Sequence, residues 1–200
     1  MMKTKAILTS ALALALAVPA VAADTFVVDK GHSEVGFQAT HLTISKVRGR
    51  FTDFVGEIQI DAAKPAASSV TLTIQTQSVD TSNADRDNDL RATDGGFFEI
   101  AKYPTITFKS TKVTPKGKDL YSVTGEFTLH GVTKTLTLPV KVVGPITDPW
   151  GNTRYAFETS TVLNRKEYGL AYNKLMDTGG LIVGDEVTVN IQLEAKRKAQ

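Results

Sequence analysis

The sequence predicts an all-β protein, and three observations predict it. Apolar residues stand at every second position in about eight segments, which is the pattern of antiparallel strands with one buried and one solvated face. Short segments rich in glycine, proline and charged residues separate those runs, as turns do. The regular spacing of strands and turns indicates a single barrel or sandwich, without a repeat, a linker or a second domain.

The alternating segments are, in chain order, 35–39, 56–60, 70–74, 106–108, 121–129, 136–142, 157–163 and 187–193. The segment 136–142 is a clear case, because Leu136, Leu138 and Val140 alternate with threonine and proline. The segment 157–163 is a weaker version, because Thr159 and Thr161 occupy two of its apolar positions. Each expected strand therefore offers one face to a core and the other to solvent.

Three short polar segments are expected to turn the chain between strands, at 115–119, 130–134 and 148–152. The stretch 81–100 has no alternation and predicts a short helix that begins at an N-cap, Ser82 or Asn83, and ends at Gly95-Gly96. Its charged residues are expected to form a solvated helix face with local Asp–Arg pairs. A second long loop, 172–185, carries three glycines.

The choice between barrel and sandwich depends on strand length. The expected strands run about 8 to 12 residues, roughly 27 to 40 Å at ~3.3 Å per residue. Such strands are long for a small sandwich and suit an elongated barrel whose dry faces enclose an apolar bore. The length favours the barrel and leaves the sandwich as the alternative.

The first 22 residues predict a secretory signal peptide. Lys3 and Lys5 form its basic start, and 6–18 is an apolar run too short to cross a bilayer. The small residues at the end of this leader predict cleavage between Ala22 and Ala23. We therefore expect an exported single domain over residues 23–200.

Composition excludes several classes of protein. The chain has no cysteine, which excludes disulfides, thiolate catalysis, cysteine-bound metals and a lipid-anchored lipoprotein. The formal charge is +2, two lysines leave with the leader, and the balance gives no electrostatic reason to expect nucleic acid. No run of eighteen apolar residues follows the leader, so we expect no integral membrane span.

No catalytic constellation or metal site emerges from the sequence. The three histidines, His32, His41 and His130, are scattered and lack the spacing of zinc hydrolases. The segment 31–35 lacks the final glycine of a nucleophile elbow, and a strand pattern follows it. The aspartates of 85–89 lack the glycine and the closing glutamate of a calcium loop. We therefore expect no catalytic residue, no metal and no cofactor.

Aromatic residues gather around the stretch 81–100 and the strands beside it. Each alone would be ordinary core, but as a group they are candidates for the mouth of a pocket. The cavity-lining residues that we expect are Phe37, His41, Phe51, Phe54, Phe97, Phe98, Tyr103, Ile106, Phe108 and Phe127.

Several motifs of the sequence resemble those of the YceI-like family, and they follow one another through essentially all of 23–200. They are 29–37 (DKGHSEVGF) with His41-Leu42, 49–56 (GRFTDFVG), 78–81, 86–91, 97–110, 125–134 (GEFTLHGVTK), 148–151 (DPWG) and 164–170. Two departures stand in the irregular stretch: Asp89, where many members have histidine, and the inserted Gly95-Gly96. Neither departure is expected to change the fold, but both leave open which ligand headgroup this chain would prefer.

The resemblance implies an elongated, lipocalin-like, eight-stranded antiparallel barrel. From its lack of alternation, we expect the irregular stretch 81–100 to form a short helical lid near the cavity mouth. The resemblance also implies a periplasmic, non-enzymatic protein without established catalytic residues. Such a protein would hold a polyisoprenoid-type lipid, such as a quinone or a prenyl phosphate, in its bore for transport, storage or sensing. The oligomeric state stays open, with a homodimer as one option.

Two other functions are compatible with the sequence. One is an enzyme that acts on an isoprenoid lipid, an isomerase or hydrolase using His32, His41 or Asp89. A buried acid–base pair with displaced pKa values would indicate it. The other is a protein–protein interaction module, whose barrel would be solid and without a cavity.

Overall fold

The computed structural model describes residues 23–94, 96–172, 174–177 and 179–199. The expected leader 1–22, and with it Ala22, lies outside the described residues, as does Gly95. Signal cleavage before Ala23 therefore stays a prediction.

The described chain is built almost entirely from strands. These are β1 (Asp24–Val28), β2 (Glu34–His41), β3 (Ser45–Phe51), β4 (Phe54–Ile60), β5 (Ser69–Gln75), β6 (Val79–Asp80), β7 (Thr105–Gly117), β8 (Leu120–Leu129), β9 (Val132–Thr147), β10 (Thr153–Asn164) and β11 (Val183–Arg197). The helical segments are α1 (Ala84–Arg91) and four short 3₁₀ turns, η1 (Lys30–His32), η2 (Pro65–Ala67), η3 (Thr76–Ser78) and η4 (Arg165–Tyr168). No helix among the described residues is long and apolar enough to cross a membrane.

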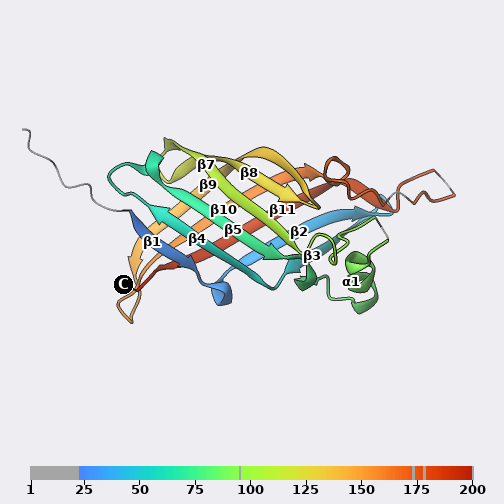
Figure 1. Cartoon of the computed structure of the whole chain (residues 1–200), viewed down its shortest axis with the longest axis horizontal. Coiled ribbons are helices and arrows are strands. Elements are labelled where there is room, and N and C mark those ends of the chain that lie inside the picture. Colours follow the sequence, from blue (N-terminus) through green and yellow to red (C-terminus); the bar gives the residue numbers. More distant parts are fainter. Residues whose placement is uncertain (1–22, 95, 173, 178, 200) are drawn as a thin grey trace, which may run out of the picture.

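The strands form one closed antiparallel sheet. Its order is β1-β4-β5-β7-β8-β9-β10-β11, and β1 pairs with β11 to close an eight-stranded barrel. The strands β2, β3 and β6 lengthen the wall at one end, because β2 continues along the same edge of β11 and pairs with β3, which pairs with β6. The barrel is elongated in consequence (Figure 1). The prediction of a barrel is confirmed, and a sandwich is excluded.

All eight expected strands are present, and three short strands, β6 (Val79–Asp80) together with β1 and β3, were missed. β1 contributes only Phe26 as a fully buried residue, so it shows no repeated alternation. β3 is polar and mostly exposed, with Phe51 as its one buried residue. Both hold their place through backbone pairing, which does not depend on an apolar pattern.

The short helix is confirmed, but its end and its polar face differ from the prediction. Asn83 is the N-cap and accepts a hydrogen bond from the Arg86 N–H at 2.9 Å. The helix ends at Arg91 rather than at Gly95-Gly96, where Arg91 donates to backbone carbonyls of η3 and β6. Asp87 is buried instead of solvated, because it accepts hydrogen bonds from the Thr81 N–H and hydroxyl.

The expected turns are present, and two are tighter than predicted. β7 runs to Gly117, so only Lys118 and Asp119 remain between β7 and β8. The turn between β8 and β9 consists of His130 and Gly131, with φ of 52° and 75°. Positive φ at both positions is the geometry of a two-residue type I′ hairpin. A side chain on Gly131 would also meet the Tyr103 ring at 2.6 Å, so glycine is required there twice over.

One end of the barrel is filled by side chains. The buried residues of this part of the core are Val35, Phe51, Phe54, Val79, Ile106, Leu129, Tyr168 and Leu170. Leu90 of α1 packs against the same core. Figure 1 shows α1 at this end of the barrel, opposite the loop that joins β4 to β5. The other half of the bore encloses a cavity.

Candidate functional site

A cavity of about 330 Å³ lies inside the barrel. Its wall is formed by inward-facing residues of β4, β5 and β7 to β11, among them Ile58, Val70, Leu72, Val113, Val123, Leu138, Val140, Phe157, Ile191 and Leu193. On β5, β9 and β11 these are the alternate apolar positions read from the sequence. The period-two pattern therefore builds an apolar container as well as a core.

The cavity opens at the end of the barrel opposite α1. Three of its exposed lining residues lie in or next to the connections at this end: Ala62 in the β4–β5 loop, Asp119 in the β7–β8 turn and Gly144 near the end of β9. These segments lie together at the end that also carries the C-terminus (Figure 1). Phe108 and Phe127 line the cavity toward the filled half. The bore is thus open at one end and blocked by core at the other.

The expectation that the irregular stretch flanks the cavity mouth is wrong for this cavity. None of the described residues of 81–103 lines it. The aromatic residues of that stretch instead complete the filled end, where Phe98 packs against Phe51 with ring centroids 5.5 Å apart. A cluster of aromatic side chains beside a loop is equally consistent with a core plug and with a pocket rim.

Of the ten expected lining residues, Phe108 and Phe127 face the cavity. Phe51, Phe54 and Ile106 belong to the filled core. The others lie around that end: Phe37 and Phe98 against the core, Phe97 stacked on Tyr172, Tyr103 against His130, and His41 at the end of β2. Whether any of the ten touches a ligand stays a prediction.

The lining residues missed by the sequence analysis include aliphatic residues of β4, β5, β9 and β11, together with Tyr121, Tyr155 and Phe157. Their signal was the alternation itself, which gives the side of the strand that faces inward. Alternation does not tell whether a given height of the bore is filled or hollow.

Few polar groups face the cavity. The Thr159 hydroxyl is buried and has no hydrogen-bond partner among the described residues. Tyr155 also lines the cavity, and burial raises the pKa of its phenol. Among the described lining residues the carboxylates are Asp61, Asp119 and Glu158, and none is lysine or arginine.

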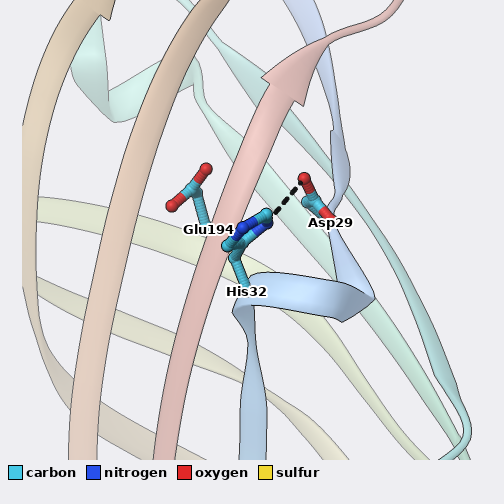
Figure 2. A group of neighbouring side chains, drawn as sticks. All are labelled: Asp29, His32 and Glu194. Carbon is cyan, nitrogen blue, oxygen red and sulfur yellow. Dashed lines mark hydrogen bonds and ion pairs between the residues drawn. The ribbon is translucent and has the colours of Figure 1, made fainter. Parts of the chain in front are cut away.

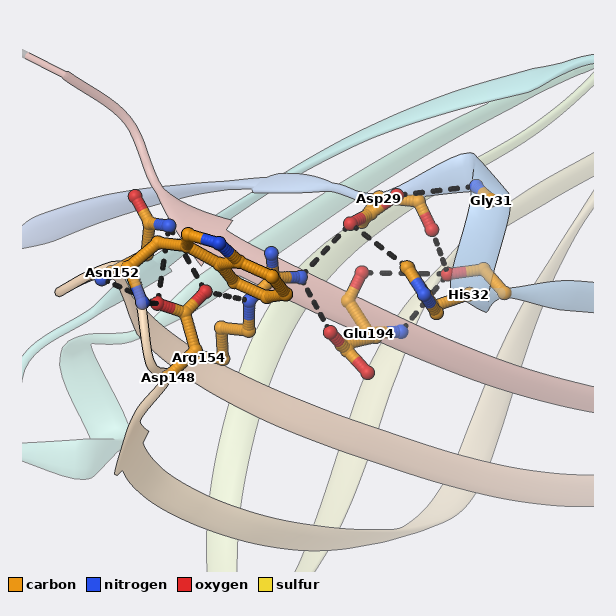
Figure 3. A network of polar contacts seen from close by, with 9 residues as sticks. Asp29, Gly31, His32, Asp148, Asn152, Arg154 and Glu194 are labelled. Atoms are coloured by element: carbon orange, nitrogen blue, oxygen red, sulfur yellow. Dashed lines mark hydrogen bonds and ion pairs between the residues drawn. The ribbon is translucent and has the colours of Figure 1, made fainter.

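A second group of polar residues lies on the outer surface of the barrel and is organised by Arg154. From β10, the Arg154 guanidinium contacts Asp148 at 2.6 Å, Asp29 at 2.9 Å and Glu194 at 2.5 Å. Figure 3 shows these side chains converging from the β9–β10 turn, the end of β1 and β11. One cation therefore joins three segments that are far apart in sequence.

The same contacts set the charge states of the carboxyls. The hydrogen bond from Arg154 is the main reason why the pKa of Asp29 lies below its usual value. Burial opposes the charged form of Asp148, but hydrogen bonds from Arg154, from the Asn152 side chain and from backbone N–H groups outweigh it, so the pKa of Asp148 falls well below its usual value. Both carboxyls stay ionised at neutral pH.

Asp29, His32 and Glu194 are also close enough together to suggest a metal site, because ligand-type atoms of all three lie within 4.8 Å of one another. In Figure 2 the exposed His32 ring lies between the two carboxylates and contacts Asp29. Arg154 already contacts both carboxylates and supplies the positive charge that a metal ion would bring. We interpret the group as part of the ion-pair network.

The model of the YceI-like domain matches residues 26–195. The chain belongs to the YceI-like family.

Relatives and solved structures agree with this membership. The UPF0312 protein of Azotobacter vinelandii is 43% identical over 170 residues, which are 84% of this chain and 87% of that protein. The crystal structure of Burkholderia cenocepacia BcnA has a TM-score of 0.73 at 27% identity and covers 84% of this chain and 98% of its own. A polyisoprenoid binding domain from Saccharophagus degradans has a TM-score of 0.64 at 19% identity, covering 88% of this chain and 99% of its own, and shows likeness of fold alone.

The YceI-like motifs of this chain lie mainly at structural joints. The first motif supplies Asp29 and the motif 148–151 supplies Asp148, and both meet at Arg154. At the filled end, Lys134 of the hairpin motif pairs with Glu167 at 2.6 Å. Arg165 is buried there and donates to the carbonyls of Leu170 and Gly184. Burial lowers the pKa of Arg165, against the pull of Asp185.

The YceI-like barrel keeps apart the residues named for catalysis. His32 is exposed on η1, His41 lies at the end of β2, and Asp89 is exposed on α1. None of the three lines the cavity among the described residues. The buried His130 has its Nε2 3.6 Å from Glu99 Oε1, at the filled end.

Proposed function

We propose that this YceI-like protein binds a polyisoprenoid-type lipid in its barrel cavity and performs no chemistry on it. The observation that carries the proposal is the apolar cavity of about 330 Å³, which opens at one end. The S. degradans neighbour, described as a polyisoprenoid binding domain, supports the same ligand class. The separation of His32, His41 and Asp89 favours a binder over an enzyme.

The physics of such binding is simple. Each buried CH₂ of a tail contributes ~0.8 kcal/mol, so a hydrocarbon chain needs no polar contact in the bore to be held. A cavity of about 330 Å³ stands at the low end of the range of ligand pockets, about 300–1,000 Å³. We therefore infer that the cavity takes the end of a long tail and that the headgroup stays at the mouth.

The mouth favours an uncharged headgroup. Asp61 and Asp119 line this end of the cavity, and no lysine or arginine lines it among the described residues. A phosphate would lie beside carboxylates there, whereas a quinone ring could accept hydrogen bonds from Tyr121 or Tyr155. Of the two lipid classes that the family resemblance implies, a quinone fits these residues better than a prenyl phosphate.

We further propose export to the periplasm, on the basis of the basic and apolar leader before Ala23. There the protein would transport, store or sense a lipid that water does not dissolve. The intact mass of protein from the extracytoplasmic fraction tests this proposal. A mass equal to residues 1–200 would contradict the cleavage.

The ligand is tested by mass spectrometry of lipids extracted from natively purified protein. We expect an isoprenoid quinone or a similar amphiphile at near-stoichiometric amount. Incubation with the extracted lipid should return it chemically unchanged, and a converted product would favour the isomerase or hydrolase instead. Protein that carries no lipid and binds no added quinone would refute the proposed function.

A further inference from the structure

The cavity mouth is bordered by exposed apolar side chains. Four of the large exposed apolar residues lie on the two hairpin ends next to it: Leu120, Val143, Ile146 and Trp150, which we call the apolar rim. Trp150 is 80% exposed and Ile146 is 58% exposed. Soluble proteins rarely gather large apolar side chains on their surface without a binding partner.

The apolar rim and the cavity share the same segments. Leu120 follows the lining residue Asp119 and precedes the lining residue Tyr121. On β9, Val143 lies between the lining residues Val142 and Gly144. The two hairpins are joined directly, because the Val142 N–H donates to the Asp119 carbonyl at 2.8 Å. The rim therefore borders the opening, with cavity-facing and solvent-facing side chains alternating along the chain.

The turn that presents Trp150 has a fixed geometry. The Trp150 N–H donates to Asp148 Oδ1 at 3.0 Å, and the Gly151 N–H donates to the Asp148 carbonyl at 3.0 Å. Asp148 is in turn held by Arg154 (Figure 3). The indole is thus exposed on an ordered support rather than on a loose loop.

The cavity lining at the mouth carries the carboxylates Asp61 and Asp119, whereas lysines lie on the exposed surface around the rim. Lys116 and Lys118 are exposed at the β7–β8 hairpin, and Lys64 is exposed on the β4–β5 loop at the same end of the barrel. Lysines around an apolar, tryptophan-bearing edge suit a surface with phosphate groups outside and hydrocarbon beneath. Indole rings prefer the headgroup level of bilayers for the same reason.

We propose that the apolar rim docks reversibly on a phospholipid bilayer, with Trp150 at the headgroup level and the cavity mouth facing the membrane. This inference rests on the proposed function, because a lipid ligand has to enter from a membrane and return to one. Docking of this edge lets the tail pass between bilayer and bore without crossing water. The partner that we propose for the apolar rim is a bilayer with anionic lipid, rather than a second copy of the chain.

The chain offers its own reporter, because Trp150 is the only tryptophan. Addition of phosphatidylethanolamine–phosphatidylglycerol vesicles should shift its emission to the blue and reduce its quenching by acrylamide. Vesicles with brominated acyl chains should quench it. The double variant Leu120→Ser, Ile146→Ser keeps both Trp150 and the cavity lining, and it should weaken vesicle binding at least tenfold.

The matched control removes two exposed aliphatic residues from the opposite end, by Ile44→Ser with Leu175→Ser. It should bind vesicles like the unchanged protein. The variants are identical outside the substituted positions, so a difference in vesicle binding between the rim variant and the control variant is due to the rim residues. Equal vesicle binding by the rim and control variants would overturn the proposal. A blue-shifted emission that depends on protein concentration without vesicles would overturn it in favour of a dimer.

A second readout separates this inference from the proposed function. A quinone delivered in detergent should bind equally to unchanged protein and to the rim variant, while its uptake from vesicles should be slower for the rim variant. Quinone binding without any response of Trp150 to vesicles would contradict the docking surface but not the proposed function. Failure of the unchanged protein to bind quinone from detergent would contradict the proposed function itself.

Discussion

Two neighbours on β9 show how the fold assigns roles residue by residue. Leu138 is buried and lines the cavity, while Thr137 is exposed and its hydroxyl pairs with that of Thr124 at 2.9 Å on the outer face. Period two leaves a strand residue no orientation between these two.

Leu138→Asp should abolish lipid binding or weaken it sharply, because an unpaired carboxylate in a dry cavity costs several kcal/mol. Thr137→Asp adds the same charge one residue away, toward water, and should bind normally. Titration with a fluorescent isoprenoid measures both, and thermal unfolding shows whether each variant is folded. Normal binding by a folded Leu138→Asp variant would mean that the ligand lies elsewhere.

Thr159 stands in the same bore with a hydroxyl that has no partner among the described residues. Thr159→Val keeps the shape and removes the unsatisfied group, so we expect the unfolding free energy to rise by about 1 kcal/mol. Urea unfolding of the ligand-free protein checks this. Destabilisation instead would show that a bound water or a lipid group satisfies the hydroxyl.

At the scale of elements, the Arg154 network ties the β9–β10 turn to β1 and β11. The pKa values of Asp29 and Asp148 are depressed in the folded protein. A carboxyl of this kind contributes stability above its unfolded pKa of about 3.9, and the contribution is lost as pH falls through the lower folded pKa.

Arg154→Met should therefore destabilise the barrel more at pH 7 than at pH 3, since the carboxylates it leaves unpaired are protonated in acid. Denaturant midpoints across this range measure the difference. Arg197→Met removes an exposed pair with Asp24 and should have a small effect at either pH. A loss for Arg154→Met that does not change with pH would show that its role is packing rather than charge.

The helix α1 is an element whose stability should be separable from binding. Asn83→Ala removes its N-cap and should cost about 1 kcal/mol of unfolding free energy. Because α1 lies at the filled end, lipid affinity should stay the same (Figure 1). Parallel unfolding and lipid titrations test this, and a clear loss of affinity would restore α1 as a lid.

At the scale of the whole molecule, alternation predicted the strands, their inward faces and the barrel. It could not predict which half of the bore is hollow, because that depends on how Phe51, Phe98 and Tyr168 meet from distant segments. The Arg154 network was invisible for a similar reason: its partners are separated by most of the chain. The alternation along a strand shows to which side each residue faces. The position of that residue along the bore depends on how the strands pair in the closed sheet.

The seam of the barrel joins the first strand to the last, with Phe26 facing Arg197 and Val28 facing Ala195. The ring of strands cannot close until the final residues have been synthesised. Contacts between such distant segments form slowly, since their loop entropy is lost before they are rewarded. A chain of this topology cannot close its barrel before β11 has been made, and a barrel that closes late would suit the export that we propose from residues 1–22.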